Sequence, residues 1–583
     1  MSIFVKLGWY FKREWKIYLV GLFGLLLTAL VGIIPPRIIG NLVDSIHNGK
    51  LTAKYLMFLL IVLTIVSFAQ YGARYMWRTA IWGEAAKLEK VLRNRLFFHY
   101  TSMDHEFFQR YRTGDLMAHA TNDLSAIQRV AGGGILQFAD SMITGGTTLI
   151  AMVTLIDWRL TLIAILPFPL LAVMARYLGT KIHIAFRDSQ AAFSRLNNKA
   201  EESITGIKVI KGLGQQKEDM QDFDNQVART ININRRVNFL DSLFDPMTTM
   251  IIALSYVITI VYGGYLVTNG TITIGSLVSF VSYLAMMIWP MFAVGMLFNT
   301  LERGNASYDR VMDLINQQSK VIDDPNGVTI TPKGEIDYDV KSFSYPGDKR
   351  LALQNIDFKV PAGKTVGLVG KVGSGKSTIL RLILRQFDNY KGSIKFGGID
   401  IKQYKMDALI PAIGYVPQDT FLFSQSIREN IRFARPDATQ AEVEQAAKKS
   451  DLYDQIQAMP DGYDTAVGEE GISLSGGQRQ RLSIARALLI NPELLILDDA
   501  LSAVDAETET QILENLHAER SDKTTIISAH RLSSVMNADE ILVIDDGKIV
   551  ERGTHDQLMT RGGWYHEMFE RQELETKVKG GNS

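Results

Sequence analysis

Long runs without a charged side chain fill much of the first half of the chain, and they constrain its fold more than any other feature. Residues 17–36 and 55–73 carry no charge over twenty and nineteen positions, and residues 246–301 carry none over fifty-six. A helix needs about 20 apolar residues to cross a bilayer core of about 30 Å. The first two runs therefore predict one span each. The third predicts two, divided at Asn269-Gly270-Thr271.

Two further runs bring the predicted spans to six. Residues 130–156 contain one charge, Asp140, and residues 160–175 contain none, with a tight turn between them. The stretch before the first span mixes aromatic and basic residues and has no small-residue cleavage site, so it predicts an interfacial helix rather than a signal peptide. The predicted spans are residues 17–36, 55–73, 134–156, 160–178, 247–268 and 275–298.

Basic residues are concentrated in the two long connections between spans. Residues 74–129 hold nine Lys and Arg, residues 176–236 hold eleven, and the three opposite loops hold four together. Since cytoplasmic segments are enriched in Lys and Arg, this asymmetry predicts that both termini lie in the cytoplasm. The connections are rich in helix formers, and we expect helical hairpins that are either solvated or touch a cytoplasmic domain at their tips, residues 112–115 and 212–215.

Charge and cysteine content exclude several classes of protein. The chain has 62 basic and 62 acidic residues, so no global field favours nucleic acid, and we expect no nucleic-acid partner. It has no cysteine, which excludes disulfides, thiolate metal sites, iron–sulfur clusters and a cysteine nucleophile.

The second half alternates short β-rich runs, glycine turns and helical stretches, a pattern typical of an α/β domain. Its clearest motif follows a short apolar strand at residues 365–369. Glycines there allow backbone amides to turn toward phosphate oxygens at the start of a helix. We expect Lys376 to contact the β- and γ-phosphates and Ser377 to bind Mg²⁺. The motif is Gly370-Lys371-Val372-Gly373-Ser374-Gly375-Lys376-Ser377, followed by Thr378.

Two further motifs lie downstream of this P-loop. The apolar strand at residues 494–497 ends in Asp498, a carboxylate that can hold magnesium through water. A pentapeptide ahead of a helical sequence can present amides and the Ser475 hydroxyl to phosphate. It reads Leu474-Ser475-Gly476-Gly477-Gln478.

The predicted fold class is an α-helical six-span transmembrane domain followed by an α/β P-loop ATPase domain, with ATP and Mg²⁺ as cofactors. We expect residues 1–318 to form the transmembrane domain and residues 319–333 to form a linker. Residues 334–571 would form the nucleotide-binding domain, and residues 572–583 a tail.

This combination resembles the ATP-binding cassette (ABC) transporters, and specifically the bacterial exporters in which six spans precede one nucleotide-binding domain. The resemblance covers nearly the whole chain. It implies that Leu474–Gln478 is the family's signature motif, which faces the γ-phosphate of ATP on the P-loop of the other subunit. One ATP site would therefore need two chains, embedded in the lipid bilayer of the bacterial cytoplasmic membrane.

The resemblance also assigns roles to single residues. Tyr345 is similar to the aromatic residue that stacks on adenine, and Gln418 to the glutamine that links magnesium to the membrane domain. His530 resembles the switch histidine at the γ-phosphate. The loop from Ser502 to Asp505 resembles the one that communicates between the two sites, and Gly468-Glu469-Glu470-Gly471 an exporter-specific loop that touches the cytoplasmic helices.

One position departs from the family pattern. Members usually place a glutamate directly after the strand-ending aspartate to polarise the attacking water, and this chain has Asp499. Aspartate is one methylene shorter, and general-base contributions of about 10²- to 10⁴-fold depend on reach. We therefore expect slow hydrolysis at this chain's own P-loop.

The shortened carboxylate beside an intact signature resembles one subunit of the heterodimeric exporters. The implied partner is a second half-transporter that has the catalytic glutamate and an altered signature, so this chain's signature would complete the competent site. A homodimer with two slow sites, or an aspartate that works, is the alternative.

The membrane segments suggest what is transported. Asp140 is a candidate contact for a cationic substrate, although it equally fits a structural role. Trp289 and Met291 belong to a run of methionine and aromatic residues that can repack around varied ligands, or simply pack helices. These features predict ATP-driven export of small amphiphilic drugs or dyes. A lipid or peptide flippase is an alternative, and an ATP-gated channel or regulatory subunit is one from another class.

Overall fold

The computed structural model describes residues 3–468, 471 and 474–580 and divides the chain into two units. The first comprises Met1–Thr101 and Thr113–Gln317, and the second comprises Ser102–Arg112 and Gln318–Ser583. The prediction of a membrane domain that is continuous over residues 1–318 is corrected at one point, because Ser102–Arg112 packs with the second unit.

The first unit is helical. Among the described residues, six helical stretches are long and apolar enough to cross a membrane. A helix can span a bilayer because its backbone N–H and C=O groups are hydrogen-bonded to one another. The six stretches are built from α3 (Trp15–Gly32) and α4 (Ile34–His47); α5 (Ala53–Thr101); α7 (Thr113–Ala118), α8 (Leu124–Arg129) and α9 (Ile135–Leu155); α10 (Trp158–Ile165) and α11 (Phe168–Thr205); α13 (Gln216–Thr268); and α14 (Ile274–Ile315).

Proline explains two interruptions of these helices. The break between α3 and α4 lies at Ile33, just before Pro35 and Pro36, and the break between α10 and α11 includes Pro167. A proline ring clashes with the preceding helical turn and lacks an N–H donor. Pro246 and Pro290 instead lie inside α13 and α14, which continue through them.

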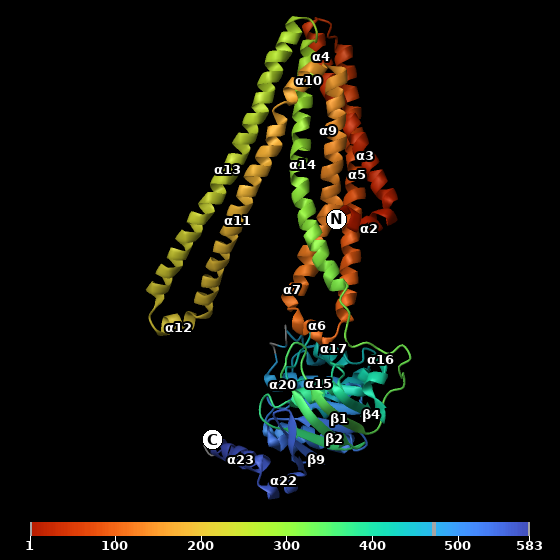
Figure 1. Cartoon of the computed structure of the whole chain (residues 1–583), viewed down its shortest axis with the longest axis vertical. Coiled ribbons are helices and arrows are strands. Elements are labelled where there is room, and N and C mark those ends of the chain that lie inside the picture. Colours follow the sequence, from red (N-terminus) through yellow and green to blue (C-terminus); the bar gives the residue numbers. More distant parts are fainter. Residues whose placement is uncertain (1–2, 469–470, 472–473, 581–583) are drawn as a thin grey trace. The chain divides into compact units, whose positions relative to one another are not determined.

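The long connections are helical, as the sequence predicts. Helices α11 and α13 run side by side and are joined by the short α12 (Ile207–Gly212), after which Leu213–Gln215 form the turn (Figure 1). The other connection turns through α6 (His105–Arg110), whose segment belongs to the second unit. The N-terminal α1 (Ile3–Lys6) and α2 (Gly8–Arg13) bury Ile3 and Tyr10, and the Tyr10 hydroxyl donates to Glu84 at 2.9 Å.

Helices α4 and α14 approach so closely that a glycine is required on each. A Cβ atom on Gly275 would lie 1.9 Å from the carbonyl oxygen of Gly40. Nearby, the hydroxyl of Tyr283 donates to the Ile33 carbonyl at 2.7 Å, and Ser279 donates to the Pro36 carbonyl at 2.9 Å. These bonds add side-chain donors from α14 to carbonyls at the start of α4 and so join the two helices.

The second unit contains two sheets. The four-stranded sheet has the order β2-β1-β4-β5 and is antiparallel; the six-stranded sheet has the order β10-β9-β3-β8-β7-β6, parallel except for β10. The strands are β1 (Ile336–Phe343), β2 (Leu353–Val360), β3 (Thr365–Val369), β4 (Lys391–Phe396), β5 (Ile399–Asp400), β6 (Ile413–Val416), β7 (Leu494–Asp498), β8 (Thr524–Ser528), β9 (Glu540–Asp545) and β10 (Lys548–Gly553).

Helices cover these sheets and supply the ends on which the site is built. Strands β3, β7 and β8 are almost wholly buried, which fits their continuous apolar sequences. The main helices are α15 (Lys376–Ile383), α16 (Met406–Leu409), α17 (Ile427–Arg432), α18 (Gln440–Lys449), α19 (Tyr453–Gln457), α20 (Gly476–Leu489), α21 (Ala506–Glu519), α22 (His555–Arg561) and α23 (Trp564–Gly580).

The predicted linker and tail are more closely attached to the domain than the sequence suggests. Arg385 is buried, and its guanidinium donates to the linker carbonyl of Ile322 at 2.9 Å. The predicted tail, residues 572–583, does not begin at a boundary, because α23 continues through residue 572 to Gly580. Neither segment has a sequence pattern that reveals its packing.

Candidate nucleotide site

The loop between β3 and α15 has the backbone of a phosphate cradle. Gly370, Gly373 and Gly375 have φ angles of 145°, 77° and 112°, which other residues rarely adopt. A Cβ on Gly370 would also lie 2.1 Å from the Ile544 carbonyl oxygen. Glycine is therefore required where the predicted motif has it, and the loop leads into the N-terminus of α15.

Lys376 is buried at the start of α15 and folds back over the loop. Its ammonium donates to the carbonyls of Gly370 at 2.8 Å and Lys371 at 3.0 Å. Burial lowers its pKa, against the opposing effect of Asp498 and Asp499. A phosphate group would supply stronger, charged acceptors for these donors and favour the protonated lysine.

Ser377 and Asp498 meet although 121 residues separate them. The Ser377 hydroxyl donates to the Asp498 carboxylate at 3.1 Å, because α15 begins and β7 ends at this edge of the parallel sheet. Burial raises the pKa of Asp498, and bonds from Ser377 and Ser528 oppose the shift. A hydroxyl beside a carboxylate is a donor set that fits Mg²⁺, which takes one or two protein ligands together with phosphate oxygens and water.

A cavity of about 390 Å³ opens at this edge, a volume in the range of small-molecule sites. Tyr345 lies on its wall, where its hydroxyl is 2.9 Å from the Thr378 hydroxyl and its ring packs on Phe387. The lining also includes Arg350, which bonds Asp546 at 2.8 Å. The predicted residues along the cavity are Tyr345, Val372, Gly373, Ser374, Gly375, Lys376, Ser377, Thr378, Gln418, Asp498, Asp499 and His530.

Asp499 is held in an unusual backbone conformation, with a φ of 49°. Its N–H donates to the Ser528 carbonyl at 2.8 Å. One carboxylate oxygen accepts from Gln418 Nε2 at 3.3 Å, and the other accepts from the His530 backbone N–H at 3.4 Å. Both oxygens of this short side chain are thus engaged by the chain's own groups.

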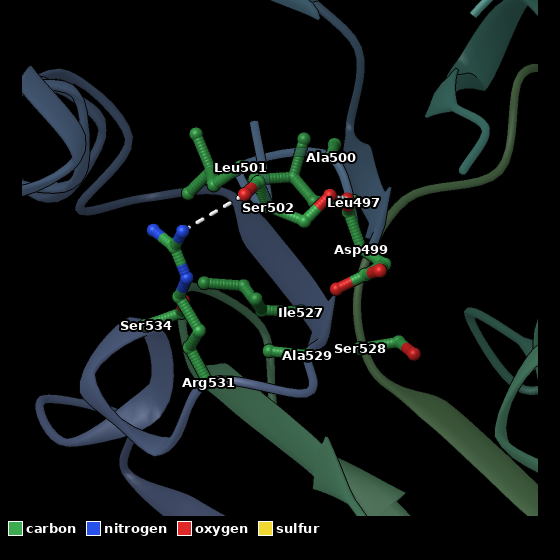
Figure 2. Close-up of a pocket in the computed structure, with 10 residues that line it drawn as sticks. All are labelled: Leu497, Asp499, Ala500, Leu501, Ser502, Ile527, Ser528, Ala529, Arg531 and Ser534. Carbon is green, nitrogen blue, oxygen red and sulfur yellow. Dashed lines mark hydrogen bonds between the residues drawn. The ribbon is translucent and has the colours of Figure 1, made fainter. Parts of the chain in front are cut away.

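Behind Asp499 lies a second cavity of about 10 Å³, which has room for one water molecule at most. Figure 2 shows the guanidinium of Arg531 directed across it to the Ser502 carbonyl, with the two groups 2.9 Å apart. This void is too small for any ligand larger than water.

The pentapeptide Leu474–Gln478 forms a helix start of its own. Ser475 caps α20: its hydroxyl accepts from the Gln478 N–H at 3.2 Å, and the Gln478 side chain accepts from the Ser475 N–H at 3.0 Å. The capping box fixes Gly476 and Gly477 in the first turn. Asp505 similarly caps α21 by accepting from Thr508 N at 3.0 Å.

Not all predicted site residues come together in one chain. The nucleotide cavity is lined by neither Leu474–Gln478 nor Asp505, all of which the structure describes. Gly370 and Lys371 contribute carbonyls to Lys376 but lie outside its lining. Glu469 and Glu470, in the predicted exporter-specific loop, lie outside the described residues.

The predicted substrate residues lie on two packed helices of the first unit. On α9, Asp140 is half-buried and accepts from the Thr144 hydroxyl at 2.6 Å. The next residue, Ser141, donates to the Pro290 carbonyl of α14 at 3.1 Å. On either side of that proline, Trp289 is exposed and Met291 packs against the helical core.

Sequence reasoning missed residues that act through the backbone of others. Arg531 binds two carbonyls of the loop Ser502–Asp505, and its only signal is that it follows His530. Gln572, on α23, bonds the backbone of His530 and Leu532 and gives no signal in the sequence.

Comparison with known proteins connects this site to the helical unit. Residues 4–291 match the family described as ABC transporter transmembrane region, and residues 353–502 match the family described as ABC transporter.

Two curated relatives extend over nearly the full chain. The "Probable multidrug resistance ABC transporter ATP-binding/permease protein YheI" of Bacillus subtilis (strain 168) is 44% identical, covering 100% of this chain and 99% of its own. The "Multidrug resistance-like ATP-binding protein MdlA" of Escherichia coli (strain K12) is 41% identical, covering 99% and 98%.

A solved structure has a similar fold. It is described as a bacterial Atm1-family ABC exporter with ATP bound, and it is 28% identical with a TM-score of 0.78 over 96% of this chain and 99% of its own.

Proposed function

This chain belongs to the ABC transporter family, and from that premise we propose that it is one subunit of a heterodimeric exporter with one hydrolysis-impaired ATP site. It is a multi-pass membrane protein that binds ATP and couples ATP hydrolysis to export. As a half-transporter it acts as a dimer. The proposal concerns four further points: the inequality of the two ATP sites of that dimer, its substrates, the side of the membrane on which its termini lie, and the role of each site residue.

The proposed substrates are small amphiphilic compounds such as drugs or dyes. Support comes from the names of the two curated relatives, both of which refer to multidrug resistance. The methionine and aromatic side chains around Trp289 and Met291 also suit ligands of varied shape. Asp140 would balance a positive charge on the compound. The surplus of Lys and Arg in the long connections supports a cytoplasmic position for both termini.

The lining of the cavity supports the roles that we propose for its residues at the nucleotide. Tyr345 would bind adenine, and Lys376 and the loop amides would bind the phosphates. Ser377, Asp498 and Gln418 would hold Mg²⁺, which when bound neutralises charge on the phosphates. His530 would contact the γ-phosphate. Binding of two ATP molecules would draw two such domains together, and their separation after hydrolysis would reset the cycle by alternating access.

The observation that carries the asymmetric proposal is the state of Asp499. A general base must reach the water it activates. This carboxylate is short and is engaged by both Gln418 and the His530 backbone. It is therefore poorly placed to activate water, and this chain's P-loop would hold ATP and hydrolyse it slowly. The intact Leu474–Gln478 would serve the partner's P-loop, where a glutamate follows the strand-ending aspartate.

Substitution of Asp499 in the assembled transporter tests this assignment. Asp499→Asn should lower ATP turnover by less than about threefold, because the carboxylate contributes little as a base, whereas Glu→Gln at the partner's matching position should remove the general-base contribution of about 10²-fold or more. Steady-state ATPase assays with coupled transport measure both. A loss of 100-fold or more for Asp499→Asn would instead assign this chain a working base.

A further inference from the structure

The C-terminal helix α23 is attached to the ATPase core by one face. Tyr565, Met568 and Phe569 recur at the spacing of a single helical face, and Gln572 continues that face one turn further. Tyr565 is fully buried and its hydroxyl bonds His555 at 2.9 Å, while Met568 and Phe569 pack against the core cluster that includes β7 and β8 residues. The apolar part of the face anchors the helix and delivers Gln572 to a defined position.

At that position Gln572 grips the chain segment that contains His530. Its Nε2 donates to the His530 carbonyl at 2.9 Å, and its Oε1 accepts from the Leu532 N–H at 2.9 Å. One partner is an acceptor and the other a donor, so a single orientation of the amide satisfies both. The primary amide pairs with residues 530–532 much as a neighbouring strand would.

The same segment reaches two other parts of the site. The His530 N–H donates to Asp499 at 3.4 Å. Between the two groups that Gln572 bonds, Arg531 extends its guanidinium to the Ser502 carbonyl at 2.9 Å (Figure 2). The same guanidinium donates to the Val504 carbonyl at 2.9 Å and to Glu509 at 3.3 Å. The position of residues 530–532 therefore determines where the His530 side chain lies and where the backbone of the loop Ser502–Asp505 is held.

We propose that Gln572 is a positioning residue of the ATP site, and that through it α23 fixes the switch segment His530–Leu532 in the geometry that distinguishes ATP from ADP. The proposal rests on the proposed role of His530 at the γ-phosphate. When the Gln572 side-chain amide is removed, the bonds of Arg531 still hold the segment in place. The His530 carbonyl, however, loses the donor that Gln572 supplies. Affinity for ATP should fall, whereas ADP, which lacks the γ-phosphate, should be bound as before.

The test uses the full-length transporter in its assembled form. Photolabelling of this chain by 8-azido-ATP, resolved from its partner by gel, is competed with MgATP or MgADP, and the ratio of the two competing affinities is recorded. Gln572→Ala removes both bonds. Gln572→Glu keeps the size and the acceptor but cannot donate to the His530 carbonyl at neutral pH. Leu574→Ala, at an exposed position on the same helix, is the matched control.

Both Gln572 variants should lower the preference for ATP over ADP by roughly fivefold, the size expected for the loss of one hydrogen bond, while Leu574→Ala leaves it unchanged. The thermal unfolding midpoint without nucleotide should stay at the wild-type value for Gln572→Glu, which keeps the packing. An unchanged ratio, or an equal loss of ATP and ADP affinity, would overturn the proposal.

A His530→Ala variant distinguishes failure of the Gln572 proposal from failure of the proposed role of His530 at the γ-phosphate. If His530→Ala retains the ATP preference, the proposed role of His530 fails. If His530→Ala loses the preference and the Gln572 variants retain it, only the positioning role of Gln572 fails.

Discussion

At the scale of single residues, Gln480 ties the signature helix to the loop that follows β7. It is buried on α20, where its Nε2 donates to the Ser502 hydroxyl at 3.1 Å and its Oε1 accepts from the Ala503 N–H at 2.9 Å. The backbone packs tightly here, since a Cβ on Gly477 would lie 3.0 Å from the Ala503 carbonyl oxygen. The signature and this loop therefore move as one piece.

We expect Gln480→Leu to lower ATP turnover of the assembled transporter about fivefold or more, because it leaves the Ala503 N–H without its partner at a cost of about 1–3 kcal/mol. Nucleotide affinity at this chain's own P-loop should hardly change, since that cavity is lined by other residues. ATPase assays and nucleotide competition measure the two effects. Gln511→Leu, on the exposed side of α21, is the control, and wild-type turnover in Gln480→Leu would refute the coupling.

At the scale of elements, one carboxylate joins α6 to the linker. Asp104 caps α6 by accepting from the Phe107 N–H at 3.0 Å, and its other oxygen accepts from the Lys320 N–H at 2.5 Å and the Ser319 hydroxyl at 3.1 Å. Burial would raise the pKa of Asp104, but these donors outweigh it and lower the pKa. The linker therefore acts as a strap that holds α6 on the second unit.

Asp104→Ala should loosen this strap, at a cost of about 1–2 kcal/mol for the lost cap and linker bonds. Hydrogen exchange at pH 7 should rise in peptides covering residues 102–112 and 318–325. Glu106→Gln is the control, because the Lys320 side chain with which it pairs is largely exposed and such an ion pair contributes little. Equal exchange in Asp104→Ala and the wild type would contradict the strap.

The lowered pKa of Asp104 also gives a pH dependence. A carboxyl group whose folded pKa is depressed stabilises the fold fully above its unfolded pKa of about 3.9, and the contribution is lost as the pH falls through the lower folded pKa. The difference in unfolding midpoint between the wild type and Asp104→Asn should therefore be full at pH 7 and shrink below about pH 4. A difference in unfolding midpoint that increases as the pH falls would contradict the lowered pKa of Asp104.

At the scale of the whole molecule, the signature and the P-loop cavity do not share a site within one chain. The described residues lining the cavity come from the P-loop, the loop between β1 and β2, the segments at the ends of β6, β7 and β8, and the turn between β9 and β10. Leu474–Gln478, which forms the capped start of α20, is not among them. If Leu474–Gln478 has its proposed role at ATP, a complete site would need a second copy of the domain. In the asymmetric proposal that copy belongs to a different half-transporter.

The asymmetric proposal, in which this chain's own site lacks an effective general base, predicts that the chain expressed alone hydrolyses ATP at less than about a tenth of the rate of the assembly with its partner. In sealed vesicles the assembly should move an amphiphilic dye uphill, and ATPase activity should respond to the dye. Full ATPase activity and transport by the purified single chain would favour the homodimer. Flux that only runs downhill would favour a channel.

The amino-acid sequence was sufficient to identify the structural class of each half of the chain. Charge-free runs of span length leave a chain no soluble alternative, and the six helical stretches appear where those runs lie. The P-loop was equally readable, because its chemistry is local: three glycines at positive φ and a helix start are set by eight consecutive residues. For the same reason, Asp498 and Ser377 were predictable as a pair from a strand end and a loop that such sheets bring together.

Contacts between distant segments could not be predicted, because they lack a local sequence pattern and are set by tertiary packing. Gln572 meets His530 across 42 residues, and Lys320 meets Asp104 across 216. The close approach of Gly40 and Gly275 joins α4 to α14 in the same way. In each case one partner is a backbone N–H or carbonyl, which every residue carries. The sequence of side chains therefore does not identify which backbone group will be the partner, since that depends on how the distant segments pack.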